Sequence, residues 1–256
     1  YVSARDIIVD WKIPLVGITS SHTWLHQGPL WTYMLSIFLF IVNFNPLAGV
    51  YLTILFGLAT SFLVYKIGSE LFSRNVGIIG GFLYASSPLI ILFDRMPFDP
   101  SPIPFFTILY FYSIYKWVNG KILYFPLVIT LLAVLYSLEL ATFSLFLPFL
   151  LIFIYGFFKK ATWVKEVFNF KIIAYSIFGF LAIMLPIIVY DLSNGFKQTV
   201  IFLGWVFVYK PFSFLFNHAP DLPSTGFSVV INFLLQSIRK IVFESNLFVS
   251  ILLFGI

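Results

Sequence analysis

Residues 46–66 read PLAGVYLTILFGLATSFLVYK. No charged residue occurs in this stretch before Lys66, and its length matches the roughly 20 apolar residues that a helix needs to cross a bilayer. Pro46 stands at its start, where a proline is favoured because the first helical N–H has no partner within the helix. The stretch is therefore predicted to be a membrane-spanning helix.

Similar apolar runs follow along the rest of the chain, separated by short loops that contain charged residues, prolines or glycines. Together with the first, they predict six full spans, the other five at residues 76–93, 105–117, 122–138, 141–158 and 172–190. A seventh apolar run begins near Asn246. The predicted fold class is all-α, a polytopic transmembrane helical bundle.

The composition excludes a soluble globular domain. Hydrophobic residues make up 61% of the 256 residues and charged residues 10%, with a mean hydropathy of +1.01, whereas soluble domains carry roughly 25% charged residues. The net charge of +5 forms no basic stripe, so no nucleic-acid partner is expected. Cysteine is absent, which excludes disulfides and thiolate metal sites. We expect a longer parent chain, because the sequence begins without methionine and ends within an apolar run.

These runs divide the chain into four parts. Residues 1–45 are predicted to form the first extracytoplasmic loop, and residues 46–190 the six spans. Residues 191–243 are predicted to form a further extracytoplasmic loop, and residues 244–256 the start of a truncated seventh helix.

Two interfacial helices are predicted in the first loop. Residues 4–12 have the periodicity of a short amphipathic helix, which Pro14 ends. After Gly28 and Pro29, the apolar stretch 30–42 is too short for a span, so an interfacial or re-entrant helix is predicted there.

The basic residues predict the orientation in the membrane. Eight cations and two carboxylates follow the first, third and fifth spans: Lys66, Arg74, Lys116, Lys121, Lys159, Lys160, Lys165 and Lys171, with Glu70 and Glu166. The positive-inside rule places these loops in the cytoplasm. The first loop, the DRMPFDP loop (94–100), Glu139 and the segment after Asp191 then share the outer face. We expect a multi-pass protein of the plasma or inner membrane whose active face is extracytoplasmic.

The first loop holds the densest polar stretch of the chain. Asp6 fits either a catalytic carboxylate or a surface ion pair with Arg5 or Lys12. His22 and His26 are four residues apart, but no third ligand is nearby, so no metal site is predicted. His26 fits either a substrate contact or a structural histidine.

Other candidates lie near the ends of predicted spans. Asp94, Arg95 and Asp99 fit either a substrate site or an ion pair that caps two spans. Glu139 lies between two apolar runs and is a functional candidate, because a carboxylate in lipid is unfavourable. Asp191 fits the cap of a turn or helix end better than a substrate contact.

An ordered series of motifs resembles a group of membrane enzymes. The series is ARDIIVDW (4–11), IPLVG (13–17), HQGPLWTYML (26–35), YKIGSELFSRNVGIIGGFLYASSP (65–88), DRMPFDPSPIPFF (94–106) and LPIIVYDLSNGF (185–196). It is similar to bacterial glycosyltransferases of the GT-C superfamily, in the branch of the protein mannosyltransferases, the lipid A aminoarabinose transferase and the RgtA/B/C/D-like domains. The likeness covers almost the whole sequence, which corresponds to the N-terminal part of such an enzyme.

The resemblance implies a hexosyl- or pentosyltransferase that moves a sugar, with inversion, from a polyprenyl-phosphate-linked donor at the extracytoplasmic face. The acceptor is a glycan, a lipid or a protein, and no cofactor is implied. It also implies an outer-loop carboxylate as base, at a position that corresponds to Val2. Either Asp6 takes this role, or the alignment is shifted, or the copy is inactive. A lysine that lies near the donor phosphate in relatives corresponds to Gln27, beside His26.

Sugar transfer makes two chemical demands on such a site. The acceptor hydroxyl needs a carboxylate that takes or orients its proton. The departing phosphate needs cationic or hydrogen-bonding groups. The expected catalytic residues are Asp6 and Asp99, and the expected substrate-binding residues are Arg5, His26, Gln27, Asp94, Arg95 and Glu139. Lys197 and Arg239 are further candidates for contact with the phosphate.

Two other functions stay open. A transporter or flippase for lipid-linked glycans would place ionisable residues near the middle of its spans. An inactive relative with a scaffolding role would be consistent with Val2. The predicted spans are nearly free of charge, which favours the glycosyltransferase.

Overall fold

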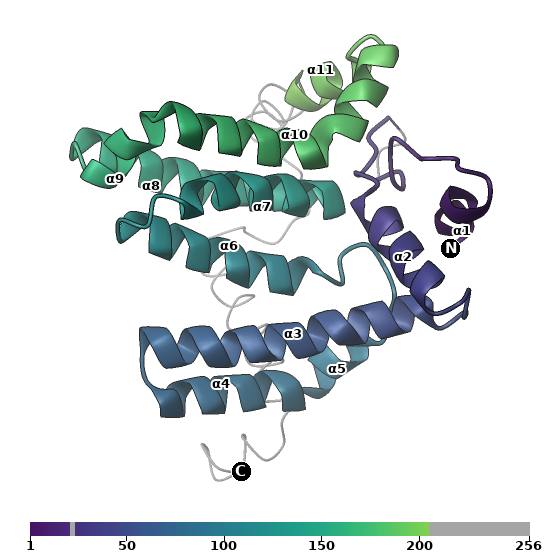
Figure 1. Ribbon diagram of the computed structural model, residues 1–256, viewed down its shortest axis with the longest axis horizontal. Helices are drawn as coiled ribbons and strands as arrows, with labels where there is room; N and C mark the ends of the chain where they lie inside the picture. Colours follow the sequence, from purple (N-terminus) through teal and green to yellow (C-terminus); the bar gives the residue numbers. More distant parts are fainter. Residues whose placement is uncertain (21–23, 205–256) are drawn as a thin grey trace, which may run out of the picture.

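The computed structural model describes residues 1–20 and 24–204 (Figure 1). Within these residues the regular secondary structure is helical, apart from one isolated β-bridge between Thr19 and His26. The all-α fold class predicted from the sequence is confirmed. His22, Arg239 and the predicted seventh span lie outside the described residues.

Two helices precede the first span, as predicted. α1 (Val2–Val9) ends at Val9 rather than Lys12, because Trp11 has a left-handed φ of 55° and the amides of Asp10 and Lys12 both donate to the carbonyl of Asp6. α2 (Leu30–Ile41) begins directly after Pro29.

The first span is continuous and the second is broken. α3 (Ala48–Leu71) has 24 residues, or ~36 Å of helix. The run 76–93, predicted as one helix, consists of α4 (Arg74–Ser86) and α5 (Pro88–Asp94), bent by 62°. Pro88 causes the break, because it has no N–H to continue the helix and disfavours helical geometry at the preceding residue.

The remaining predicted spans also form helices. They are α6 (Ile103–Val118), α7 (Tyr124–Leu138), the 3-10 helix η1 (Leu140–Leu145) with α8 (Phe146–Phe158), and α10 (Phe170–Ser193). Short helices α9 (Thr162–Lys165) and η2 (Glu166–Phe168) precede α10, and α11 (Lys197–Gly204) follows it.

Three helical segments of the described chain are long and apolar enough to cross a membrane, namely α3, η1 with α8, and α10. The bent pair α4 and α5 makes a fourth if it is counted as one span. α6 and α7 have 16 and 15 residues, or roughly 22–24 Å, so full spans there remain a prediction.

The long helices lie side by side in the order α4, α3, α6, α7 and α10 (Figure 1). The loops and adjoining helix ends that carry the eight cations named above lie at one end of the bundle, here called the basic end. α1, α2, α5 and α11 gather at the other, here called the acidic end. The described parts of the polar segments that were predicted to share one face therefore lie at the same end of the bundle.

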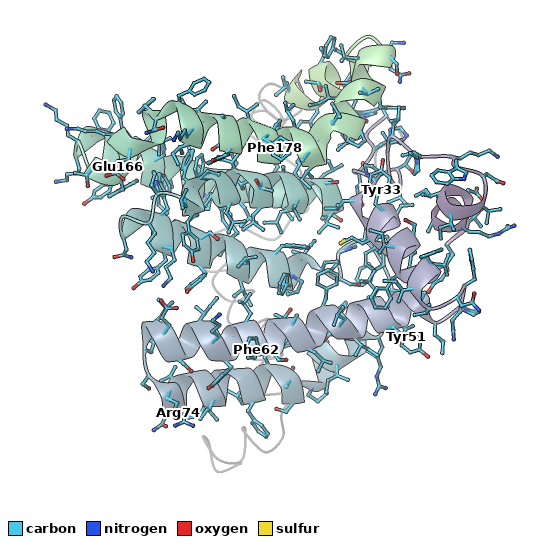
Figure 2. The ribbon with its side chains drawn as sticks, in the orientation of Figure 1. Tyr33, Tyr51, Phe62, Arg74, Glu166 and Phe178 are labelled. Carbon is cyan, nitrogen blue, oxygen red and sulfur yellow. The ribbon has the colours of Figure 1, made fainter. Side chains whose placement is uncertain are left out.

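The core lies between α6, α7 and α8, around Trp117. Its indole is fully buried and its N–H donates to the carbonyl of Trp163 at 3.1 Å. Tyr110 is also fully buried and its hydroxyl donates to the carbonyl of Leu145 at 2.7 Å. By contrast Phe62 and Phe178, labelled in Figure 2, are 62% and 76% exposed, as expected for side chains that meet lipid.

α3 and α4 approach closely through glycines. A Cβ on Gly77 would lie 2.4 Å from the carbonyl oxygen of Tyr65 and 2.6 Å from the amide nitrogen of Ser69. Those are backbone atoms, which cannot move aside without separating the helices. A Cβ on Gly80, in the same helix, would meet only a methyl group of Val64 at 3.4 Å. Small residues at a membrane helix interface permit this kind of contact.

Gly77→Ala is expected to destabilise the bundle by about 1–3 kcal/mol, because the added methyl overpacks the interface. Gly80→Ala is the matched control, since it makes the same change in the same helix with room for the methyl. Thermal unfolding in detergent, followed by circular dichroism, compares them. Equal unfolding midpoints would contradict this packing of α4 on α3.

Candidate functional site

The segment before α2 folds into an antiparallel hairpin at the acidic end. The amide of Gly17 donates to the carbonyl of Gln27 at 2.8 Å, and the amide of Gln27 donates to the carbonyl of Ile18 at 2.9 Å. Further along, the amide of Ser20 donates to the carbonyl of Leu25 at 2.8 Å. These bonds join residues 17–20 to residues 24–28, here called the hairpin.

The hairpin docks on the last turn of α7 through Gly28. The amide of Gly28 donates to the carbonyl of Ser137 at 2.9 Å. A Cβ on Gly28 would lie 1.9 Å from Ser137 Oγ and 2.9 Å from Ser137 Cα. No larger residue fits there without displacing the hairpin. The sequence indicated Gly28 only as the entry to a helix, and its contact with α7 was not predicted.

Docking brings Gln27 to Glu139. Gln27 Nε2 donates to Glu139 Oε2 at 2.9 Å, and Gln27 is only 4% exposed. Glu139 ends α7, and its Oε1 accepts from the amide of Ala141 at 3.5 Å at the start of η1. Gln27 Oε1 is buried and has no hydrogen-bond partner among the described residues. Both residues were predicted site residues, and they are in direct contact.

Asp99 lies near Glu139, in the loop between α5 and α6, and is 9% exposed. Burial raises the pKa of Asp99 to about 6, and the negative charge of Glu139 acts in the same direction. A hydrogen bond from its own backbone amide acts in the opposite direction. Gln27 and Glu139 are in contact, and the charge of Glu139 acts on Asp99, so these three predicted residues are here called the carboxylate group.

A second set of contacts ties the hairpin to α10 and α11 through Gln198. Gln198 Nε2 donates to the carbonyl of His26 at 3.1 Å, and Gln198 Oε1 accepts from the amide of His26 at 3.1 Å. The ring of His26 also packs edge-on against Tyr190, with centroids 5.4 Å apart. Asp191 is buried and caps α11, accepting from the amides of Gln198 at 2.9 Å and Thr199 at 3.0 Å.

His26 is therefore held by hydrogen bonds to Gln198 and by ring packing on Tyr190. The predicted capping role of Asp191 is confirmed. Gln198 was not predicted, because it lies in a segment that the sequence indicated to be irregular.

Asp94 lies apart from the carboxylate group, against α3. A Cβ on Gly57 would be 2.1 Å from Asp94 Oδ2, so the carboxylate packs on the middle of that helix. It lines a cavity of about 260 Å³ with Tyr84 and Arg95. The bend between α4 and α5 places it there, deeper than its predicted position at a span end. Among the described residues neither Asp94 nor Arg95 forms an ion pair.

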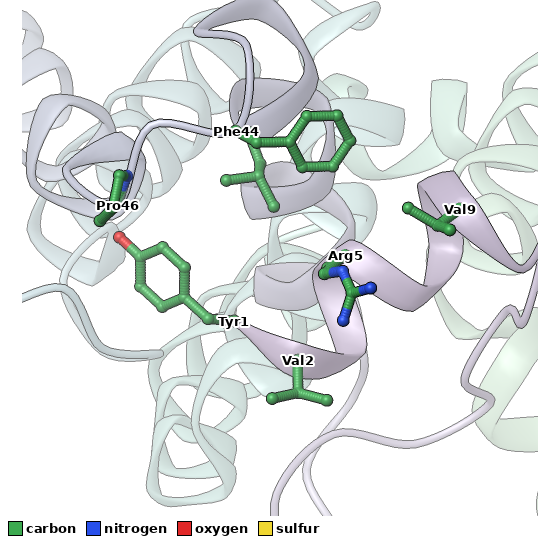
Figure 3. Close-up of a pocket in the computed structure, with 7 residues that line it drawn as sticks. Tyr1, Val2, Arg5, Val9, Phe44 and Pro46 are labelled. Atoms are coloured by element: carbon green, nitrogen blue, oxygen red, sulfur yellow. The ribbon is translucent and has the colours of Figure 1, made fainter.

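Arg5 and Asp6 lie on α1, outside the carboxylate group. Arg5 lines a largely apolar pocket of about 500 Å³ with Tyr1 and Val2 (Figure 3). Asp6 is half-buried, and its side chain makes no hydrogen bond or ion pair within the described part of the chain. The exposed carboxylate of Asp10 lies 3.6 Å from the amine of Lys12, so the surface ion pair of this segment forms just after α1 and does not include Asp6.

The described residues contain no group of three or more histidine, cysteine or acidic side chains that could hold a metal ion. The hydrogen-bonding groups of the site are carboxylates, amides and one imidazole. Such groups can accept a proton from a hydroxyl and orient a polyhydroxy substrate.

A comparison with protein families matches residues 26–190 to the family described as dolichyl-phosphate-mannose-protein mannosyltransferase. The chain belongs to this family. It is a membrane glycosyltransferase of the GT-C type, as the motif series indicated. Comparisons with curated proteins and with solved structures gave no match. In this mannosyltransferase-family chain, the matched stretch contains the whole carboxylate group, whereas Arg5 and Asp6 precede it.

Asp191→Ala is expected to release the first turn of α11, because the amides of Gln198 and Thr199 lose their acceptors. A lost helix cap costs roughly 0.5–2 kcal/mol, so these two amides should exchange hydrogen about 2- to 30-fold faster. Hydrogen exchange with mass spectrometry on residues 197–204 measures this. Unchanged exchange would contradict the capping role, and Asp10→Asn, on an exposed pair, is the control.

Proposed function

We propose that this chain transfers a sugar from a polyprenyl-phosphate-linked donor to a hydroxyl acceptor, with inversion, and that Asp99 is the catalytic base. Family membership supports the donor class, because the family is named for a dolichyl-phosphate sugar. The observation that carries the assignment of the base is the burial of Asp99, on which the charge of Glu139 also acts.

A base works best when its pKa lies near the working pH. An ordinary aspartate is a weak base at neutral pH, whereas Asp99 has a pKa raised to about 6 and is still mostly ionised at pH 7. In the reaction Asp99 takes the proton of the acceptor hydroxyl while the oxygen of that hydroxyl forms a bond to the anomeric carbon of the sugar. The bond from that carbon to the phosphate oxygen breaks, and the electron pair leaves with the polyprenyl phosphate.

Glu139 and Gln27 support Asp99 in this account. Burial raises the pKa of Asp99 and the charge of Glu139 adds to that rise, while Gln27 holds Glu139 by its 2.9 Å hydrogen bond. For the departing phosphate, the acidic end offers Arg5, Arg95 and Lys197. All three are exposed and free of ion pairs within the described residues.

The reaction is proposed for the extracytoplasmic face of a cell membrane. The eight cations of the basic end support this orientation, because basic loops favour the cytoplasmic side. The carboxylate group lies at the opposite, acidic end of the bundle.

The decisive assay follows labelled sugar from polyprenyl-phosphate donors into acceptor, using membranes that contain the full-length protein. Asp99→Asn is expected to lower transfer about a hundredfold or more, because general base catalysis contributes that much, and Asp10→Asn should leave it unchanged. Full activity of Asp99→Asn with loss in Asp6→Asn would identify Asp6 as the base instead.

Loss of fold does not account for the expected defect. The pKa of Asp99 is raised in the folded state, so the folded protein binds the proton of this side chain more tightly than the unfolded chain does. This contributes to stability in full below the pKa of an ordinary aspartate, and the contribution is lost as the pH rises through about 6. At neutral pH the ionised side chain therefore disfavours folding. Asp99→Asn should unfold at the same temperature as wild type or a higher one.

Transfer is expected to fall as the pH drops below about 6, where Asp99 becomes protonated. Glu139→Gln removes the neighbouring charge and should move this acidic limb of kcat/KM lower by about half a pH unit. Glu166→Gln, a carboxylate change at the basic end, is the control. A limb that does not move in Glu139→Gln would contradict the coupling of the two carboxylates.

Transport of lipid-linked glycans is the second candidate, and the position of Asp94 favours it. An ionisable side chain against the middle of α3 is the feature expected of a transport path. Movement of lipid-linked sugar across the bilayer, without transfer from any donor, would replace the proposed activity with this one.

A further inference from the structure

A pocket of about 540 Å³ lies at the basic end, between the loop that joins α6 to α7 and the start of α10. It is far from the carboxylate group and plays no part in the proposed reaction. Its lining residues are Ile122, Leu123, Lys165, Glu166, Asn169, Lys171, Ile172 and Tyr175.

The charged side chains of this pocket are poorly neutralised. Lys165 and Lys171 are exposed and form no ion pair within residues 1–20 and 24–204. Glu166 is the one carboxylate in the lining, and it also has no ion-pair partner there. The pocket therefore presents two ammonium groups and a net positive charge.

The surroundings of the pocket are apolar and exposed. Leu123 is 68% exposed, Phe170 83% and Tyr175 56%. These residues lie where α7 and α10 begin, the level at which the apolar helices meet the loops. Lysines beside exposed aromatic and aliphatic groups at that level are typical of the membrane–water interface.

We propose that this pocket binds the headgroup of an anionic phospholipid. The phosphate accepts from the ammonium groups of Lys165 and Lys171, and the acyl chains run along the exposed apolar surface toward the bilayer. Basic pockets between membrane helices bind such headgroups. Two ammonium groups against the single carboxylate of Glu166 leave the pocket net positive, so it binds a lipid with a net negative charge more strongly than a zwitterionic one.

Native mass spectrometry of the purified full-length protein in detergent tests this site, with phosphatidylglycerol and phosphatidylcholine as the two probes. Wild type should retain phosphatidylglycerol preferentially. Each lysine near an anionic lipid is worth about fivefold in affinity, so Lys165→Gln with Lys171→Gln should weaken retention roughly 30-fold. Glu166→Gln should strengthen it, which is the opposite sign.

The matched control is Lys66→Gln with Arg74→Gln. It removes two cations from the same end of the bundle, but from α3 and α4, on the side away from Glu166 (Figure 2). Its retention of phosphatidylglycerol should stay within about threefold of wild type. Three results would overturn the proposal. Wild type could bind both lipids equally, the control could lose as much phosphatidylglycerol as the Lys165 and Lys171 variant, or millimolar glycerol phosphate could displace the bound lipid.

Discussion

The contact between Gly28 and Ser137 is the constraint on which the candidate site depends. It lets the backbone of the hairpin lie directly on the last turn of α7, with an amide-to-carbonyl bond of 2.9 Å. The two residues before Gly28 make the other contacts of the site. Gln27 donates a hydrogen bond to Glu139, and the carbonyl of His26 accepts one from Gln198. A single close approach thus joins the first loop, α7 and α11 at one end of the bundle.

Burial and like charge then determine the chemistry of that end. Asp99 is removed from water and lies near a second carboxylate, and both effects favour its protonated form. Among residues 1–20 and 24–204, the cations lie either exposed at the acidic end or far away at the basic end. A site of this kind can accept a proton from a neutral hydroxyl and release an anionic phosphate.

The helices could be predicted from the sequence because apolar runs and prolines act locally. The bend at Pro88 was not predicted, because the apolar run continues through this proline and favours one helix. The pairing of Gln27 with Glu139 spans 112 positions in sequence, and no local pattern reports such a contact. Glu139 was predicted because a carboxylate between apolar runs is unfavourable in lipid, and Gln27 because the family resemblance aligns it with a lysine near the donor phosphate. Gln198 was missed because its role depends on a turn and a cap that form only after α10 ends.

The most direct test of the central claim is sugar transfer by full-length Gly28→Ala protein, with Gly204→Ala as control. A Cβ on Gly204 would meet no atom of the described residues within 4 Å, so that variant should match wild type. Gly28→Ala should lose about a hundredfold in transfer, because displacement of the hairpin by an ångström misplaces the reacting groups. If Gly28→Ala, folded and in the membrane, transfers sugar as fast as the control, the docked hairpin does not build the site.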